Sequence, residues 1–426
     1  MIPIDLSPVR EQFPALQKTF NGKKRIFLDG AGGTQVPQVV IDAMFDYMVN
    51  INANYGGYYK TSVETDKMLV DIRQDVADFI NARSWEEIVL GPNMTTLTFN
   101  LVWALSRTIK PGDEVVVTRL DHGANIDGWK ALQERGARIR YIEIIDEDCT
   151  LNYDMAEKLI NKKTKLIAVG LASNAVGTVN KVKKFVALAH DVGALLFIDA
   201  VHYAPHFPID VIDIDCDFLV YSAYKCFGPH VGFLYGKKQY LEELNPYRPW
   251  PSHNEVPYKY NVGTPNMEGF AGARAAIGYL ANIGEVYGKA LSSQYSGFTD
   301  RRLSMKLGMA AIAEYELGLS RRLNEGLTHI KNIKVYGITK PERLQERCPT
   351  YSFTMQGITS AEICRKMSEE GIYVWNGEDG LGALELVEYL DITKIGGLLR
   401  VSLEHYNTIQ EIDRFLDILD SISKKV

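Results

Sequence analysis

Residues 197–236 read "FIDAVHYAPHFPIDVIDIDCDFLVYSAYKCFGPHVGFLYG" and contain three apolar runs of strand length. The first run ends at Asp199, the second leads to Lys225, and the third follows a Gly-Pro turn. Such continuous apolar runs are typical of strands that are buried on both faces of a parallel sheet. Lys225 then raises a question, because a buried ammonium group is costly unless it is paired, neutralised or used covalently.

The same pattern extends toward the N-terminus of this stretch. Further strand-like runs occupy residues 86–91, 113–125, 137–144 and 165–174. Segments with helical spacing separate them, for example residues 125–136 and 180–193. This alternation predicts an α/β fold with a mainly parallel seven-stranded sheet that is covered by helices on both faces. Ligands of such a sheet bind beyond the C-terminal ends of its strands.

The second half of the chain has a different pattern. Residues 241–268 are rich in Pro, Asn and Tyr and predict a long ordered excursion rather than a linker. Long helical segments follow, and shorter strand and helix patterns close the chain. We therefore expect a smaller C-terminal α+β domain, and we find no internal repeat.

Composition narrows the range of partners. The chain has 426 residues, 46% of them apolar, and a net charge of −6 with dispersed basic residues. This charge argues against nucleic acid and against an anionic membrane surface as partners. No signal-peptide pattern and no run of about 18 apolar residues is present, so a cytoplasmic location is the default expectation. Five cysteines without paired spacing predict neither a disulfide framework nor a zinc site.

Several polar side chains fall at or just past the ends of the predicted strands. They are Thr95, Thr96, His122, Asn174, Asp199, His202, Ser222 and Lys225. Each has a simple interpretation when taken alone, because threonines cap helices, aspartates form turns, histidines can be ordinary polar groups and lysine tips are usually solvated. Their joint placement at one edge of the sheet favours a shared ligand site.

A pyridoxal 5′-phosphate site needs a lysine, an anion at the pyridine nitrogen, a flat group against the ring and donors for the phosphate. Lys225 can supply the amine, and Asp199 can keep the ring nitrogen protonated. His122 can stack on the ring. Thr95 and Thr96, at the start of a predicted helix, offer hydroxyl and N–H donors to a phosphate. We predict this cofactor.

Residues 197–236 resemble the cofactor-lysine region of the class V aminotransferase superfamily, in its cysteine desulfurase and selenocysteine lyase branch. Further motifs in the same order are "FLDGAGGTQVP" (27–37), "NANYGG" (52–57), "HGANIDGW" (122–129), "SNAVGT" (173–178), "GTPN" (263–266) and "RVSLEHYNT" (400–408). The resemblance implies fold type I of the pyridoxal phosphate transferases. It also implies an N-terminal segment (1–30) packed on the small domain, a large cofactor-binding domain (31–290) and a small C-terminal domain (291–426).

The resemblance assigns roles on the cofactor side of the site. It makes Lys225 the Schiff-base lysine, Asp199 the pyridinium partner, His122 the stacking ring, His202 the neighbour of the ring hydroxyl and Asn174 a residue beside cofactor and substrate. Thr95, Thr96 and Ser222 match phosphate ligands. Tyr224 stands where relatives often have a histidine that contributes to the phosphate site.

The resemblance also implies roles for residues farther along the chain. Thr264 matches a threonine that reaches the phosphate from a neighbouring subunit, which implies a homodimer with composite sites. Arg400 matches the arginine that binds the substrate carboxylate, a role that suits a bidentate guanidinium. Trp375 aligns with another arginine of the relatives and is expected to contact the substrate.

The sequence departs from the family pattern on the substrate side. Desulfurases of this branch carry a cysteine that forms a persulfide, but residues 374–386 contain none, and the matching position is near Gly380. Gly56 and Gly57 replace a His-Arg pair. Cys364 is expected to be an inert buried thiol. Cys226 is expected to point away from the cofactor, because extended neighbours face opposite sides.

The leading hypothesis is therefore a pyridoxal phosphate lyase that cleaves a C–S or C–Se bond of an amino acid without a persulfide cysteine. An amino-acid epimerase or an aminotransferase is the alternative among enzymes, because the same cofactor and lysine support both reactions. A non-catalytic binding module is a further alternative. A nucleotide-binding dehydrogenase is disfavoured, because no G-x-G-x-x-G follows the first strand.

Overall fold

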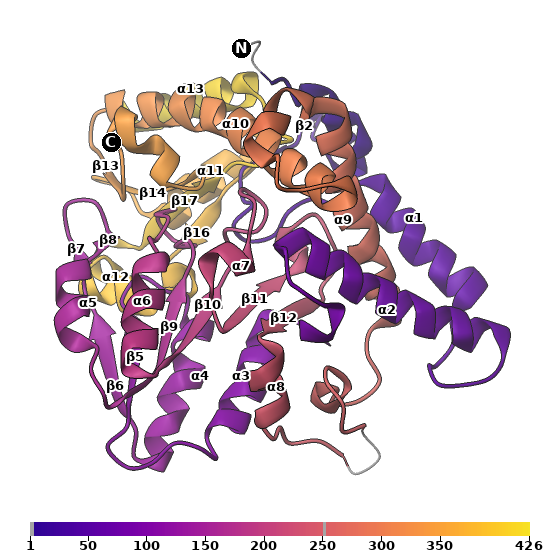
Figure 1. The fold of residues 1–426 in the computed structure, drawn as a ribbon. Coiled ribbons are helices and arrows are strands. Elements are labelled where there is room, and N and C mark those ends of the chain that lie inside the picture. The colour runs from indigo at the N-terminus through magenta and orange to yellow at the C-terminus, as the bar shows by residue number, and fades with distance from the viewer. Residues whose placement is uncertain (1–3, 250–252) are drawn as a thin grey trace.

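A seven-stranded sheet forms the centre of the computed structural model, which describes residues 4–249 and 253–426 (Figure 1). In spatial order the strands are β4 (Ile88–Gly91), β12 (Gly232–Gly236), β11 (Phe218–Ser222), β10 (Leu195–Asp199), β9 (Thr164–Gly170), β5 (Glu114–Thr118) and β6 (Arg138–Ile142). Strand β12 is antiparallel to both of its neighbours, and the other pairs are parallel. The mainly parallel α/β sheet that the apolar runs predict is confirmed.

The central strands are largely apolar and buried, as expected of a sheet against which helices pack, whereas the edge strand β6 carries the exposed Arg138 and Arg140. The side chains of Val115, Val116 and Val117 in β5 are fully buried. The helices of this part are α2 (Lys60–Ile80), α3 (Met94–Leu105), α4 (Asp127–Lys130), α5 (Tyr153–Leu159), α6 (Lys183–Val192), α7 (Val211–Ile214), α8 (Lys238–Glu243) and α9 (Met267–Tyr287). Helix α3 packs on β11 and β12, and α6 packs on β9 and β10.

The C-terminal part is built on a four-stranded antiparallel sheet. Its strands, in spatial order, are β13 (Ile333–Tyr336), β14 (Thr350–Met355), β17 (Leu398–Ser402) and β16 (Trp375–Gly377). Its helices are α10 (Asp300–His329), α11 (Ser360–Glu369), α12 (Leu384–Tyr389) and α13 (Ile409–Ser423). These elements enclose a second hydrophobic cluster around Leu323, Phe353 and Phe415. The domain boundaries at residues 30 and 290 stay predictions.

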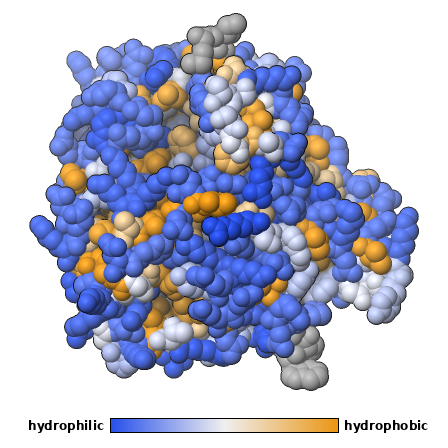
Figure 2. Space-filling view, in the orientation of Figure 1, coloured by the Kyte–Doolittle hydropathy of each residue, from blue (hydrophilic) through white to orange (hydrophobic). Residues whose placement is uncertain are grey.

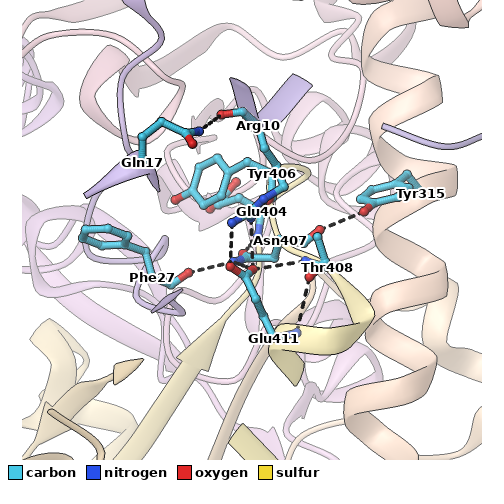
Figure 3. A network of polar contacts seen from close by, with 9 residues as sticks. All are labelled: Arg10, Gln17, Phe27, Tyr315, Glu404, Tyr406, Asn407, Thr408 and Glu411. Atoms are coloured by element: carbon cyan, nitrogen blue, oxygen red, sulfur yellow. Dashed lines mark hydrogen bonds and ion pairs between the residues drawn. The ribbon is translucent and has the colours of Figure 1, made fainter. Parts of the chain in front are cut away.

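The N-terminal segment lies against this C-terminal part. Strand β3 (Ile26–Phe27) pairs in parallel with β15 (Ile372–Tyr373). Arg10 forms an ion pair with Glu411 at 2.7 Å, and Asn407 Nδ2 donates to the carbonyl of Phe27 at 2.9 Å (Figure 3). Beyond β3 the chain reaches the lysine turn, where the N–H of Thr34 donates to the carbonyl of Tyr224 at 3.0 Å. The two ends of the chain thus support one side of the region around Lys225.

The remaining elements lie at the periphery. They are α1 (Gln38–Asp46), β1 (Thr19–Phe20), β2 (Lys23–Lys24), β7 (Ile144–Ile145) and β8 (Thr150–Leu151). Helix α1 and the start of α2 form a projecting arm (Figure 1), and hydrophobic residues are scattered over that arm as they are over other parts of this face (Figure 2). Among the described helices, none is long and apolar enough to cross a membrane.

Candidate active site

A cavity of about 570 Å³ lies beyond the C-terminal ends of the central strands. Most of the residues that the sequence singles out line it, namely Thr95, Thr96, His122, Asn174, Asp199, His202, Ser222, Tyr224 and Lys225. They come from the N-terminus of α3 and from the segments that follow β5, β9, β10 and β11. The cavity therefore stands where an open α/β sheet is expected to bind its ligand.

Asp199 and Lys225 approach the cavity from neighbouring strands. Strands β10 and β11 are parallel and adjacent, and Asp199 pairs with Val220. The Asp199 carboxylate accepts the N–H of Val201 at 2.8 Å, and burial raises its pKa to about 6. Such a carboxylate gains from a cationic partner, since an opposite charge offsets the cost of its burial.

Lys225 is almost fully buried, with 6% of its surface exposed. Burial, followed by the nearby positive charge of Arg400, lowers the pKa of its amine to about 8. An amine with this pKa is partly neutral near pH 7, which is the form that attacks a carbonyl group. Lys225 lies in a 3-10 turn (Ala223–Lys225), so the extended backbone expected at residues 225 and 226 is wrong. Cys226 is nevertheless buried beneath the turn, with its Sγ near the carbonyl of Ala204.

His122 presents a flat, neutral ring to the cavity. Its Nδ1 accepts the N–H of Ala124 at 3.0 Å, and burial lowers its pKa to about 4. A loop of the C-terminal part lies directly on this ring. A Cβ at Gly382 would lie 2.4 Å from His122 Nε2, and the φ of Gly382 is +68°. Both the close contact and the backbone conformation therefore require glycine there.

The start of α3 offers hydrogen-bond donors to an anion. Asn93 caps the helix by accepting the N–H of Thr96 at 2.8 Å, and the Ser222 hydroxyl accepts the N–H of Met94 at 2.9 Å. Gly232 in β12 has no side chain, which lets the backbone of Asn93 approach the strand. Thr95 and Thr96 are exposed into the cavity at the positive end of the helix dipole. This arrangement suits a phosphate group.

Arg400 and Trp375 lie beside the cavity rather than among the described residues that line it. They are paired across β16 and β17, and the Arg400 guanidinium lies 5.7 Å from the Trp375 ring. Arg400 Nη1 donates to the carbonyl of Asn174 at 2.9 Å, while its buried Nε has no partner among the described residues. Burial lowers the Arg400 pKa to about 10, so the group is cationic at neutral pH.

Thr264 is not among the described residues of the cavity wall. It is exposed in the loop that precedes α9. The role that the resemblance implies for it requires a second subunit, so a single chain does not test that role.

Among the polar residues of the cavity wall, the sequence interpretation missed Asn93, Asp121 and His230. Asp121 is buried and accepts hydrogen bonds from the Gly170 N–H at 2.7 Å and from the Thr118 hydroxyl at 2.8 Å. Burial raises its pKa to about 7. His230 stacks on Tyr224, with ring centroids 5.1 Å apart and planes 4° apart. The Gly-Pro turn before His230 was the available signal, since it directs the chain back toward Lys225.

The arrangement fits pyridoxal 5′-phosphate. A buried carboxylate, a neutral aromatic ring, an amine of lowered pKa and a helix N-terminus converge on one cavity. Both ring nitrogens of His202 and Oδ1 of Asn174 are buried without a hydrogen-bond partner in the described chain. Unpaired buried polar atoms cost free energy, so these atoms favour a polar ligand in the cavity.

None of the cysteines, all of which are described, lines this cavity. Burial raises the pKa of Cys149, Cys216, Cys226, Cys348 and Cys364 above the usual value of a thiol. Cys364 is the least buried, and its Sγ donates to the carbonyl of Val374 at 3.1 Å. A raised pKa opposes formation of the thiolate, which is the nucleophilic form.

The chain is similar over nearly its whole length to several known proteins. The pattern of the family described as Aminotransferase class-V matches residues 26–296 and 301–415. A probable cysteine desulfurase from Synechocystis sp. is 32% identical over 99% of this chain and 96% of its own length. The aminotransferase-like protein FGM3 from Gibberella zeae is 33% identical over 97% of each chain. The apo structure of a cysteine desulfurase from Thermococcus onnurineus NA1 covers 100% of both chains with a TM-score of 0.86 and 26% identity.

Proposed function

Because the chain belongs to the class V aminotransferase family, whose members use pyridoxal 5′-phosphate, we propose that it cleaves a carbon–sulfur or carbon–selenium bond of an amino acid. The proposed reaction uses no persulfide cysteine. The observation that carries this proposal is a cavity with a complete set of cofactor-binding side chains and no thiol in its described wall. Relatives named as cysteine desulfurases support the substrate class.

The proposal gives each side chain of the cavity one task in holding the cofactor. Thr95, Thr96 and Ser222, with the first N–H groups of α3, would bind the phosphate. Asp199 would face the ring nitrogen, His122 would cover one face of the ring and Lys225 would form the covalent link. When bound, the cofactor supplies an electron-poor ring that stabilises negative charge at the α-carbon of the substrate.

Two side chains of the protein would act on the substrate itself. The Arg400 guanidinium would bind the substrate carboxylate, because it is cationic, fixed in position and retains a free Nε. The Lys225 amine, with a pKa of about 8, would take the α-proton at its Nζ. The C–S or C–Se bond would then break with its electron pair on the leaving sulfur or selenium, while a double bond forms between the α- and β-carbons. Hydrolysis of the resulting unsaturated amine would give pyruvate and ammonia.

The loop at residues 380–382 would exclude water from this chemistry. Asn174 Nδ2 donates to the carbonyl of Leu381 at 2.9 Å, and Gly382 lies on His122. Just beyond the loop, Glu385 Oε1 contacts Lys130 Nζ at 2.5 Å and the Tyr141 hydroxyl at 3.0 Å. These contacts hold the substrate-side loop against the central sheet. It is in this loop that the resemblance places the cysteine of the desulfurases.

Replacement of the cysteines by alanine is the direct test of the proposed chemistry. We expect Cys364→Ala, and each of the buried variants that folds, to keep kcat within about twofold of the unchanged protein, since no thiol is used. The assay offers cysteine, cystine, selenocysteine and alanine and measures sulfide, selenide, pyruvate and racemised product. Loss of sulfide release in Cys364→Ala, with a trapped persulfide in the unchanged protein, would contradict the proposal. Racemised alanine without sulfide or selenide would favour an epimerase instead.

We further propose that the protein acts as a homodimer through a surface that we call the α1 patch. It consists of the exposed apolar side chains Val39, Ile41, Phe45, Met48 and Val49. Phe45 is the most exposed of them, with 65% of its surface exposed. Several exposed apolar side chains on one short segment favour an interface between subunits.

Phe45→Asp is expected to convert the dimer into monomers, because it places a charge at the centre of the α1 patch. Sedimentation velocity measures the change. The matched control is Ile395→Asp, which changes an apolar residue of the C-terminal part that has 55% of its surface exposed. A dimer that survives Phe45→Asp would contradict this interface.

A mixing experiment tests whether Thr264 completes the partner's site. Lys225→Ala and Thr264→Glu are each expected to be inactive when pure. Random reassociation of the two should restore about one quarter of the original activity, because half of the dimers then hold one intact site. No recovery from a verified heterodimer would contradict composite sites.

A further inference from the structure

A group of buried titratable side chains lies directly behind His202, on the side away from the cavity. It consists of His206, Glu316 in α10 and Glu404 just after β17, and each of these side chains is at most 2% exposed. Gly30 makes room for Glu404, since a Cβ there would lie 2.1 Å from Glu404 Oε1. The chain therefore brings four distant segments together around buried polar atoms.

The contacts of this group lead from Glu316 through His206 to His202. His206 Nδ1 lies 2.8 Å from Glu316 Oε2, a hydrogen bond, and 4.0 Å from Glu404 Oε2. The rings of His206 and His202 stand 5.4 Å apart at 79°, with a nitrogen of each ring within 4.8 Å of the other. One water molecule can bridge that distance. Within the described chain, His206 Nε2 and both nitrogens of His202 have no hydrogen-bond partner.

The burial of Glu316 decides where the protons are. Burial raises the pKa of Glu316 well above its usual value, because a carboxylate in this site has lost its water. The pair formed by Glu316 and His206 is therefore uncharged as a whole. It is either a carboxylic acid with a neutral imidazole or a carboxylate with an imidazolium. A proton on Glu316 Oε1 would have no acceptor in the described chain, so the favoured arrangement has one proton between Oε2 and Nδ1 and the other on His206 Nε2.

We propose that Glu316 and His206 are positioning residues that fix the tautomer of His202, so that His202 directs an N–H group into the cavity. This inference rests on the proposed function, because it assigns the N–H group to the ring oxygen of the cofactor. His206 Nε2–H donates toward one nitrogen of His202, and the proton of neutral His202 then resides on its other nitrogen. His202 thus becomes a donor with a fixed orientation.

Burial, together with the nearby basic groups, keeps His202 neutral. Lys225, Arg400 and His206 all face it, and burial followed by these groups holds its pKa well below the usual value. Cys348 also lies within reach of the two rings. We call Glu316, His206 and His202 the relay. Burial lowers the pKa of His206, while Glu404 raises it and Lys225 lowers it further. Protonation of His202 is therefore disfavoured, and only its tautomer is open to control.

The pH titration of the bound cofactor's visible absorbance tests the donor. A donor on the ring oxygen stabilises negative charge there, so that a proton held beside this oxygen is released more easily. His206→Phe and Glu316→Leu are each expected to raise the titration midpoint by about one pH unit, the effect of losing one hydrogen bond. Glu316→Gln, whose side-chain amide keeps a polar partner for Nδ1, should hold the midpoint close to that of the unchanged protein.

Tyr47→Phe is the matched control, because it removes another buried hydrogen bond, the 3.0 Å bond between the Tyr47 and Thr65 hydroxyls, at a place away from Glu316 and His206. It should lower the melting temperature as the relay variants do and leave the midpoint unchanged. Equal midpoints in all variants, or a shift in Tyr47→Phe of the same size, would overturn the proposal. The midpoint needs no turnover, so an inactive protein with the expected shift contradicts the proposed function and not the relay.

A second measurement uses the unchanged protein without cofactor. The chain has eight histidines, and ¹⁵N-labelled histidine reports which ring nitrogen carries a proton. We expect His206 to be protonated at Nε2, with its signal assigned by its loss in His206→Phe. An unprotonated Nε2 would overturn the relay. So would one equivalent of a transition metal in the purified protein that disappears with His206→Phe, because a cation would then take the place of the shared proton.

Discussion

Lys225→Ala is expected to abolish turnover, with kcat at least about 10³-fold lower, because the variant loses both the covalent link and the base that moves the α-proton. The purified variant should also lack the visible absorbance of a linked cofactor. In the unchanged protein, borohydride should abolish this absorbance and leave a modified peptide that contains Lys225, which mass spectrometry detects. A modified peptide from elsewhere in the chain would show that another lysine holds the cofactor.

Lys306 offers a matched control for this result. It is buried, burial lowers the pKa of its amine to about 8, and its Nζ contacts the carbonyl of Ile209 away from the cavity. Lys306→Met therefore removes a second buried amine of the same pKa. We expect it to keep the absorbance and the activity of the folded protein. Equal losses in both variants would mean that Lys225→Ala acts through the fold.

The lowered pKa of Lys225 also makes the stability of the fold depend on pH. Its pKa is about 8 in the folded protein without cofactor and 10.5 in the reference state, so folding disfavours the charged form. The resulting cost is fully present below pH 8 and disappears as the pH rises toward 10.5. Lys225→Met should therefore raise the free energy of unfolding by about 2–3 kcal/mol at pH 6.5, with a much smaller gain at pH 10. Thermal unfolding at both values measures this difference.

Asp199→Asn is expected to have the next largest effect, a loss of about 10²–10³-fold in kcat, because an amide does not hold the ring nitrogen in its protonated form. The cofactor should still bind, since the phosphate contacts and Lys225 are unchanged. A cofactor analogue with a permanently charged ring nitrogen should restore part of the activity, which a structural defect would not permit.

Asp121→Asn is the control for Asp199, because Asp121 is the other carboxylate in the described wall of the cavity. Both of its oxygens already accept hydrogen bonds, from Gly170 and Thr118. Asparagine keeps one of these acceptors, and we expect less than about a tenfold loss. A larger loss in Asp121→Asn than in Asp199→Asn would mean that the two carboxylates have exchanged the expected roles.

The features that the sequence predicted are those encoded within short stretches. The apolar runs that end at Asp199 and Ser222 predicted neighbouring parallel strands, because continuous burial on both faces leaves few alternatives. Adjacent parallel strands then bring their C-terminal residues to one edge, which placed Asp199 and Lys225 at one cavity. The helix start near Thr95 was likewise predicted, although the residue that caps the helix is Asn93 and not a threonine.

The features that the sequence did not reveal depend on contacts between distant segments. Glu316 meets His206 across 110 positions, and its place in α10 carries no local sign of that contact. Gly382 reads as an ordinary loop glycine, and only the assembled fold shows that it lies on His122. The turn at Lys225 was missed for a similar reason, because a 3-10 turn after a strand has no distinct periodicity.

The ion pair between Arg10 and Glu411 joins residues 401 positions apart, and β3 pairs with β15 across most of the chain. During synthesis, the segment around Arg10 therefore leaves the ribosome long before the residues that it contacts. Until the segment that contains Glu404 emerges, Glu316, His206 and the region around Gly30 stay without it. A nascent chain that stops before β17 would hold all strands of the seven-stranded sheet but would lack Arg400 and Glu404, so the region around Lys225 is completed late in biogenesis.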